Sequence, residues 1–353
     1  MATAAPAAVT GSGHGIGTSG RAVAFFVPAD RWAFVRLAGV AAYGVAYVLW
    51  FRRYGIIIDR ISVLISVTIL LVLGHLGRPW YRWRRLAGDL VVYSAIWLAY
   101  EETRGAADRL GLPLQVESVR NLDRLLFLGA DPTVWLQRRF YSPQVVRWYD
   151  VAASVVYATH FVVPVAVIVG LWLANRFEWV RFMRRLATVL LVACASFVVL
   201  PTAPPWMAGG GDRRNRLDAL PPVARSTGRG WFHLGLDSFA HAWETGRDWV
   251  NNVAAMPSLH AAFSLLVVAF FFPWVRSRWW RAALLSFPLA MGVALVYLGE
   301  HYVVDILAAW ALVGGSCALW ARIERRGRRR RASASRQALG GVEVAEAVTA
   351  ARP

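Results

Sequence analysis

Two side chains suited to acid–base or nucleophilic chemistry, His301 and Asp305, lie four positions apart where an apolar segment begins. Residues at this spacing lie one turn apart on the same face of a helix. The carboxylate can then accept a hydrogen bond from one imidazole nitrogen, which leaves the other nitrogen available to attack or to take up a proton. The alternative is a helix-surface pair whose two members satisfy only each other.

A second motif, Pro257-Ser258-Leu259-His260, comes where another apolar segment begins. Ser258 is a favourable N-cap residue, and the first N–H groups of a helix attract anions through their unpaired donors and the helix dipole. These features predict a phosphate-binding position at Ser258, with His260 in the first helical turn beside it. The alternative is an ordinary capped membrane helix with a histidine at the interface. If the two motifs face each other, they form a site for phosphoryl transfer.

The composition indicates an integral membrane protein, because 57% of the 353 residues are hydrophobic and the mean hydropathy is +0.43. Soluble domains average about 45–50% apolar residues. Here the excess is concentrated in blocks of about 17–25 residues, the length that a helix needs to cross a bilayer. The two cysteines, Cys194 and Cys317, lie inside such blocks and suggest core positions, not a disulfide framework or a metal motif.

The net charge of +18 does not point to nucleic acid, because the basic residues stand in short runs beside the apolar blocks. The chain contains no lysine, so arginine supplies all of these positive charges. Runs of this kind are a topology signal, since basic residues favour cytoplasmic segments. We interpret the runs within residues 78–85, 176–185, 276–281 and 325–331 as cytoplasmic loops and tail.

The apolar blocks predict an all-α, polytopic membrane helix bundle with about eight transmembrane helices. Between the third and fourth blocks, residues 119–140 combine apolar and charged side chains at helical spacing. This pattern predicts a pair of amphipathic interfacial helices broken at residues 129–132, although a solvated loop helix is the alternative. We expect the spans at about residues 34–50, 56–76, 86–103, 151–174, 186–200, 258–273, 282–298 and 302–320.

An even number of spans places both termini on one side of the membrane, and the basic runs make that side the cytoplasm. His160, near the start of the fourth span, then lies at the extracytoplasmic face with His260 and His301. We therefore expect a protein of the plasma membrane whose site faces away from the cytoplasm.

Together, the two histidine motifs resemble the phosphatidic acid phosphatase type 2 superfamily, whose members are membrane lipid phosphatases and phosphotransferases. Pro257-Ser258-Leu259-His260 matches the second signature of that family, P-S-G-H, with leucine in place of glycine. His301 and Asp305 match the end of the third signature, S-R-x5-H-x3-D, but Ala294 and Leu295 stand at its Ser and Arg positions. The first signature, K-x6-R-P, has no counterpart because lysine is absent.

Residues 157–164, 201–206 and 299–305 further resemble the branch that contains the inositol phosphorylceramide synthases and their bacterial relatives. The resemblance covers about residues 119–320. It implies a catalytic membrane domain over residues 105–321. The composition predicts a disordered tail over 1–30, N-terminal transmembrane helices over 31–104 and a basic, disordered tail over 322–353.

The resemblance also implies a role for each matching residue. His301 corresponds to the nucleophile that forms a phosphohistidine, and Asp305 to the carboxylate that orients it. His260 corresponds to the general acid that protonates the leaving group and then serves as base. Ser258 corresponds to a phosphate-binding position, and His160 becomes a candidate for headgroup binding or for support behind the site.

The two arginines that clamp phosphate in the family have no counterpart at their usual positions. A phosphoryl-like transition state still needs positive charge, and the guanidinium fork suits phosphate oxygens. Each candidate could instead contact solvent or lipid headgroups. The candidates in the section leading into His260 are Arg213, Arg214, Arg216 and Arg247.

The implied reaction is phosphoryl transfer from a phospholipid or a polyprenyl-type lipid phosphate, without metal or cofactor. A lipid or polyol hydroxyl as acceptor gives an inositolphosphotransferase-like enzyme, and water gives a plain lipid phosphatase. The expected partners are the lipid substrate and the bilayer, not nucleic acid.

Two other readings remain. A metal site could form from His260, Glu300, His301 and Asp305, although no two-histidine helical motif and no cysteine ligand supports it. A transporter or a non-enzymatic lipid-binding protein could use the same histidines for proton coupling. Transporters often show internal repeats and mid-membrane polar residues, whereas this chain shows no repeat and gathers its polar residues at one face.

Overall fold

The computed structural model describes residues 32–54, 60–103, 106, 110, 112–210, 220–246 and 252–350. Within these residues the chain is helical, and its extended pairing is limited to isolated bridges between short loops. The all-α prediction is therefore confirmed. The longer helices are α1 (Trp32–Tyr54), α2 (Arg60–His75), α3 (Trp80–Glu102), α7 (Trp148–Ala174), α8 (Arg176–Val199), α12 (Leu259–Phe271), α13 (Arg278–Tyr297) and α14 (Val303–Ala350).

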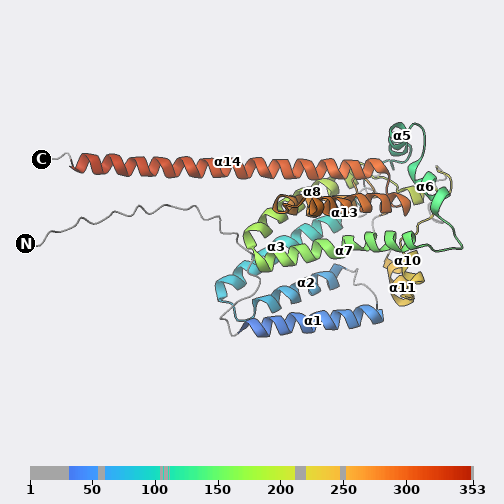
Figure 1. Ribbon diagram of the computed structural model, residues 1–353, viewed down its shortest axis with the longest axis horizontal. Helices are drawn as coiled ribbons and strands as arrows, with labels where there is room; N and C mark the ends of the chain where they lie inside the picture. Colours follow the sequence, from blue (N-terminus) through green and yellow to red (C-terminus); the bar gives the residue numbers. More distant parts are fainter. Residues whose placement is uncertain are drawn as a thin grey trace, which may run out of the picture.

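The short α-helices gather at one end of the bundle, as Figure 1 shows for those it labels. The long helices run side by side, and the far part of α14 extends beyond the opposite end (Figure 1). The short helices are α5 (Glu117–Leu126), α6 (Pro132–Phe140), α9 (Pro205–Ala208), α10 (Arg229–His233) and α11 (Asp237–Gly246).

Five of the described helices are long and apolar enough to cross a membrane: α1, α7, α8, α13 and the first part of α14. Two others, α2 and α12, are apolar but shorter. A helix lies at each of the predicted spans, including α3, and the count of about eight stays a prediction. The many exposed apolar side chains on the outer helices, such as Phe34 at 78% and Val45 at 61%, suit a lipid environment.

Helix α12 is the centre of the bundle, since it packs against α7, α8, α13 and α14. Its buried face, which includes the fully buried Leu266, belongs to the main apolar core with Phe182 of α8 and Met291 of α13. Because all four neighbours enclose α12, the residues of its first turn lie close to the side chains of those neighbours at the same level of the bundle.

The amphipathic pair is confirmed as α5 and α6, separated by residues 127–131. Its polarity is the reverse of that of a soluble surface helix. Leu122 and Leu125 are 47% and 76% exposed, whereas Asp123 between them is 1% exposed. An outward apolar face suits a helix that lies at the membrane interface.

The basic segments are a correction to the sequence-based interpretation, which treated them as loops. Residues 80–85 form the first turns of α3, and residues 176–185 form the first turns of α8. Arginine has a high helix propensity, so a run of arginines next to an apolar block extends the helix instead of ending it.

The C-terminal segment also differs from the expected disordered tail, because α14 continues as a helix through Ala350. Alanine and arginine, which dominate the segment after residue 321, both favour helix. The predicted N-terminal tail, residues 1–30, lies outside the described residues.

A candidate phosphoryl-transfer site at the start of α12 and α14

His260 and His301 face each other across the starts of two helices, with their ring centroids 5.7 Å apart. Leu259 is the first residue of α12, and Val303 is the first of α14. The structure therefore brings together the two histidine motifs, which have forty residues between them in the sequence, and their meeting point is the candidate site.

Asp305 lies beside His301, with its Oδ2 3.4 Å from the imidazole Nδ1. This distance is longer than a normal hydrogen bond, and it places the carboxylate within ion-pair range of that nitrogen. The same Oδ2 accepts a hydrogen bond of 2.9 Å from the Tyr302 amide. Because His301 is 6% exposed and Asp305 is fully buried, the carboxylate acts on the ring with little screening by water.

The chain reaches His301 through a tight end to α13. The Gly299 amide donates to the Val296 carbonyl, and the Glu300 amide donates to the Leu295 carbonyl. This is a Schellman motif, which requires a left-handed residue after the helix. Gly299 supplies it with φ +78°, and a Cβ there would lie 2.9 Å from Val223 Cγ1.

The start of α14 is held by Asp123 of α5, a residue that sequence reasoning did not select. Its two carboxylate oxygens accept hydrogen bonds of 2.9 Å from the Val303 amide and 2.8 Å from the Val304 amide. Burial raises the pKa of Asp123 to about 6, against the lowering effect of these two hydrogen bonds. Asp123 thereby fixes the helix start on which Asp305 stands.

Ser258 is fully buried and caps α12, since its Oγ accepts a hydrogen bond of 3.3 Å from the Ala261 amide. Its own amide donates to the backbone carbonyl of Asp305 at 3.2 Å. The predicted N-cap is therefore present, and Ser258 also joins the starts of α12 and α14 directly.

His160 reaches the same site from α7, with its ring centroid 3.9 Å from that of His260. Tyr157 stacks on His260 from the same helix, at 4.6 Å between centroids. His160 is 12 residues from Trp148, the first residue of α7, which is about 18 Å along the helix axis and deeper than the sequence suggested. Nδ1 of His160 and Nε2 of His260 are buried and make no hydrogen bond within the described part of the chain.

A short loop of residues 201–204 leads into α9 and contacts two segments that carry the site. The Thr202 amide donates to the Val253 carbonyl at 2.8 Å, and the Trp206 amide donates to the Gly299 carbonyl at 3.0 Å. The loop thus connects the segment before α12 with the segment before α14, which accounts for its proline-rich, irregular sequence.

Arg225 is a second residue that sequence reasoning passed over. It pairs with Glu300 through Nε at 2.7 Å and a terminal nitrogen at 3.3 Å, and its guanidinium lies 4.3 Å from the Trp206 ring centre. The only hint in the sequence is Glu300, a carboxylate next to His301 that needs a partner once buried.

The other sequence-based arginine candidates, Arg213, Arg214, Arg216 and Arg247, lie outside the described residues. Glu300, one of the ligands of the alternative metal site, instead forms an ion pair with Arg225. Within the described residues, no group of three or more His, Cys, Asp or Glu side chains is arranged to hold a metal ion.

Comparison with known proteins agrees with this architecture. Residues 118–319 match the model of the PAP2 (phosphatidic acid phosphatase type 2) superfamily, and the chain belongs to that family. It is therefore a membrane lipid phosphotransferase or phosphatase.

Within the family, the chain is similar to a protein named phosphoinositol dihydroceramide synthase from Bacteroides thetaiotaomicron. The two are 32% identical over 270 residues, which cover 74% of this chain and 82% of that protein. This similarity supports the predicted branch of inositol phosphorylceramide synthase-like enzymes. No solved structure gives a significant match to the chain.

Proposed function

We propose that this enzyme transfers a phosphoinositol-type group from a donor phospholipid to the hydroxyl of a second lipid, through a phosphohistidine on His301. The observation that carries the proposal is the pair of imidazoles 5.7 Å apart, one of them backed by a buried carboxylate. The phosphoinositol and ceramide-type substrates are suggested by the name of the similar Bacteroides protein.

In the first half-reaction, Nε2 of His301, the nitrogen on the far side of the ring from Asp305, attacks the phosphorus of the donor. A P–N bond forms while the P–O bond to the donor lipid breaks. His260 gives its proton to the departing alkoxide, and Asp305 stabilises the positive imidazole that develops.

In the second half-reaction, the acceptor hydroxyl loses its proton to His260 as its oxygen attacks the phosphorus. The P–N bond breaks, and His301 returns to its starting state. Water in place of the lipid alcohol hydrolyses the donor, and with a lipid phosphomonoester as donor this is the alternative activity, a lipid phosphatase. Both routes use only side chains of this chain, so we expect activity to persist in a chelator.

Arg225 is the described residue best placed to supply positive charge to the phosphate. Its partner Glu300, the residue before His301, and the Trp206 ring hold the guanidinium in place. The Ser258 hydroxyl, while capping α12, still has its hydrogen to donate to a phosphate oxygen. Arg213, Arg214, Arg216 and Arg247 stay candidates for further contacts.

His160 is best suited to a supporting role in this scheme. Its ring packs against His260 on one side and stacks on Phe263 at 5.4 Å on the other. Such packing restricts the rotation of the general acid, and binding of the substrate headgroup by His160 stays a second possibility for its buried Nδ1.

The site is proposed to face the extracytoplasmic side of the plasma membrane, with both termini in the cytoplasm. The basic starts of α3 and α8 lie at the opposite end of the bundle, where the positive-inside rule favours the cytoplasm. A cysteine at Leu128, which is 99% exposed after α5, should react with an impermeant maleimide in intact cells, and one at Arg326 should not. The reverse labelling would invert the topology.

The decisive experiment incubates purified protein with phosphatidylinositol carrying radioactive phosphorus, with and without a ceramide. We expect a labelled protein that is stable in base and labile in acid, and a new labelled lipid only when ceramide is present. Label released as soluble inositol phosphate in both cases would show that water, and not a lipid alcohol, is the acceptor. Equal labelling of a His301→Ala variant, or activity lost to a chelator and restored by zinc, would overturn the mechanism.

A further inference from the structure

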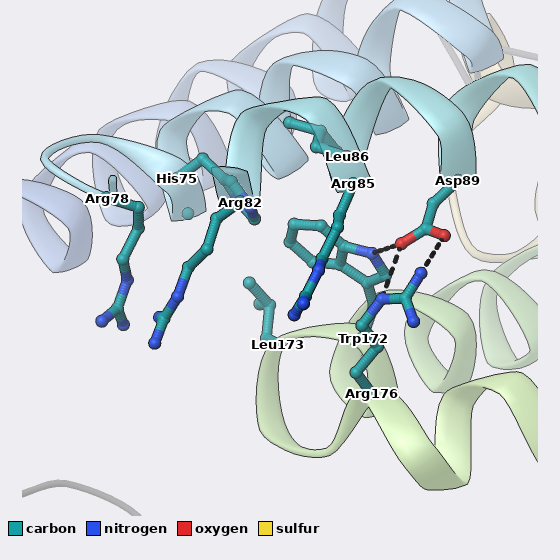
Figure 2. Close-up of a pocket in the computed structure, with 10 residues that line it drawn as sticks. His75, Arg78, Arg82, Arg85, Leu86, Asp89, Trp172, Leu173 and Arg176 are labelled. Atoms are coloured by element: carbon teal, nitrogen blue, oxygen red, sulfur yellow. Dashed lines mark hydrogen bonds and ion pairs between the residues drawn. The ribbon is translucent and has the colours of Figure 1, made fainter. Parts of the chain in front are cut away.

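A cavity of about 270 Å³ lies at the end of the bundle opposite the histidines. It is formed where α2 ends, α3 begins and α7 meets α8 (Figure 2). Its place along α7 is set by Trp172, which lines it and lies 12 residues beyond His160, or about 18 Å along the helix.

The lining of this cavity carries four arginines and a single carboxylate. That carboxylate, Asp89, is engaged by Arg176 at 3.1 Å and 2.5 Å, and it also accepts a hydrogen bond of 3.2 Å from Trp172 Nε1. The positive charges of Arg82 and Arg85 are therefore not balanced by a carboxylate within the lining.

The three arginines are placed together by the chain itself. Arg82 and Arg85 lie on one face of α3, and Arg78 precedes that face by one turn. Figure 2 shows the three side chains extending toward the same side of the cavity. Like charges at this helical spacing repel one another, so an anion between them would remove an unfavourable interaction.

The back of the cavity provides a further donor. His75 stacks on Trp172 with centroids 4.5 Å apart, and its buried Nδ1 makes no hydrogen bond to any described residue. The rim is apolar, because Leu173, which also lines the cavity, is 48% exposed. A ligand that fits has an anionic group for the guanidiniums and an apolar part beside Leu173.

We propose that this cavity binds the phosphate group of an anionic phospholipid in the leaflet opposite to the catalytic histidines. Guanidinium forks match phosphate oxygens in pairs, and basic pockets between membrane helices are suited to lipid headgroups. The bound lipid joins α2, α3 and α7, which stabilises the attachment of the N-terminal helices to the catalytic part. Free inorganic phosphate shares the same chemistry and must be separated by experiment.

The test uses the full chain in nanodiscs of phosphatidylcholine with or without phosphatidylglycerol, and in neutral detergent with or without inorganic phosphate. We compare the wild type with an Arg82→Gln/Arg85→Gln variant. Arg325→Gln/Arg326→Gln, which removes the same charge from exposed positions of α14, is the matched control. The readouts are the thermal unfolding midpoint and the number of phosphatidylglycerol molecules retained in native mass spectrometry.

We expect phosphatidylglycerol to raise the midpoint of the wild type and of the control. The cavity variant should bind the lipid at least about tenfold more weakly, because it loses hydrogen bonds to a charged group. The variant Arg82→Lys/Arg85→Lys keeps the charge and should bind phosphatidylglycerol with intermediate affinity. It serves as a control for a folding defect in the glutamine variant. An equal loss in the control would overturn the proposal, and an effect reproduced in full by inorganic phosphate would overturn its lipid assignment.

Discussion

Arginine–glutamate contacts occur at both ends of the molecule, and their surroundings give them different roles. At the histidine end, Arg225 pairs with Glu300 next to His301 and lies on the Trp206 ring. At the other end, Glu324 of α14 accepts hydrogen bonds from Arg181 at 3.0 Å and Arg185 at 2.8 Å, both on α8. The first pair joins two loops of the site, whereas the second joins two long helices.

The difference shows what an ion pair does in each place. The Arg181–Glu324–Arg185 cluster has its charges satisfied within the chain. Together with the hydrogen bonds from Ser316 to the Arg185 carbonyl and from Trp320 to Thr188, it fixes how α14 lies on α8. The Arg225–Glu300 pair stands where irregular segments meet next to His301, which is where we propose that the phosphate reacts. Variants should therefore separate catalytic effects at one end from stability effects at the other.

The largest effect is expected from His301→Ala, which removes the proposed nucleophile. Transfer activity should fall by at least about 10⁴-fold, as for other enzymes that lose a nucleophile. His233→Ala, at an exposed position of α10, is the matched control and should leave activity unchanged. Product formation and the unfolding midpoint should be measured together, and substantial activity in the folded variant would refute the role of His301.

His260→Ala should lower the rate by about 10² to 10⁴-fold, because a general acid–base group is lost. The loss should be much smaller for a donor with a p-nitrophenol leaving group, which departs without protonation. Rates for the natural and the activated donor give the comparison. Equal losses for both would argue that His260 positions the substrate instead of protonating it.

At the opposite end, Glu324→Gln should lower the free energy of unfolding by about 3 kcal/mol, because Arg185 is left buried beside an uncharged partner. Activity per folded molecule should not change. Glu117→Gln breaks an exposed contact to Arg120 of 3.9 Å and should cost at most about 1 kcal/mol. Unfolding in detergent measures both, and a specific activity loss in Glu324→Gln would contradict the separation of the two ends.

Arg225→Gln should reduce kcat/KM by about 10²-fold, the size of effect seen when one transition-state donor is removed. Arg225→Lys should recover part of the activity. The double variant Arg225→Gln/Glu300→Gln removes the ion pair without leaving a buried charge. If that double variant regains wild-type rates, Arg225 has only a structural role.

Asp123→Asn should lower stability by about 1 kcal/mol at neutral pH, because one of the two cap acceptors is replaced by a donor. Burial raises the pKa of Asp123 from 3.8 to about 6, so the folded protein takes up a proton there before the unfolded chain does. Stability from this group therefore increases as pH falls from about 6 to about 4. Unfolding midpoints at pH 7 and pH 5 should show a larger deficit of Asp123→Asn at pH 5, and an equal deficit would contradict the shift.

The sequence by itself determined the class of fold and the centre of the site. The features that carried these predictions are local: apolar blocks of membrane length, the Ser258 cap and the spacing of His301 and Asp305. Their consequences for a helix do not depend on where that helix packs. The amphipathic pattern of residues 119–140 was equally local, and α5 and α6 follow it.

Only the tertiary structure decided which distant residues support that centre. Asp123 caps α14 although 180 positions separate it from Val303, and Arg225 pairs with Glu300 across 75 positions. His160 lies against His260 because α12 begins beside the middle of α7 and not beside its start. Such contacts depend on how helices and loops pack against one another, and no period or spacing within a single segment records them. For the same reason the sequence did not indicate the arginine cavity. Residues 78–85 suggested a loop, whereas in the structure α3 places their side chains on one face, opposite Trp172 and Arg176.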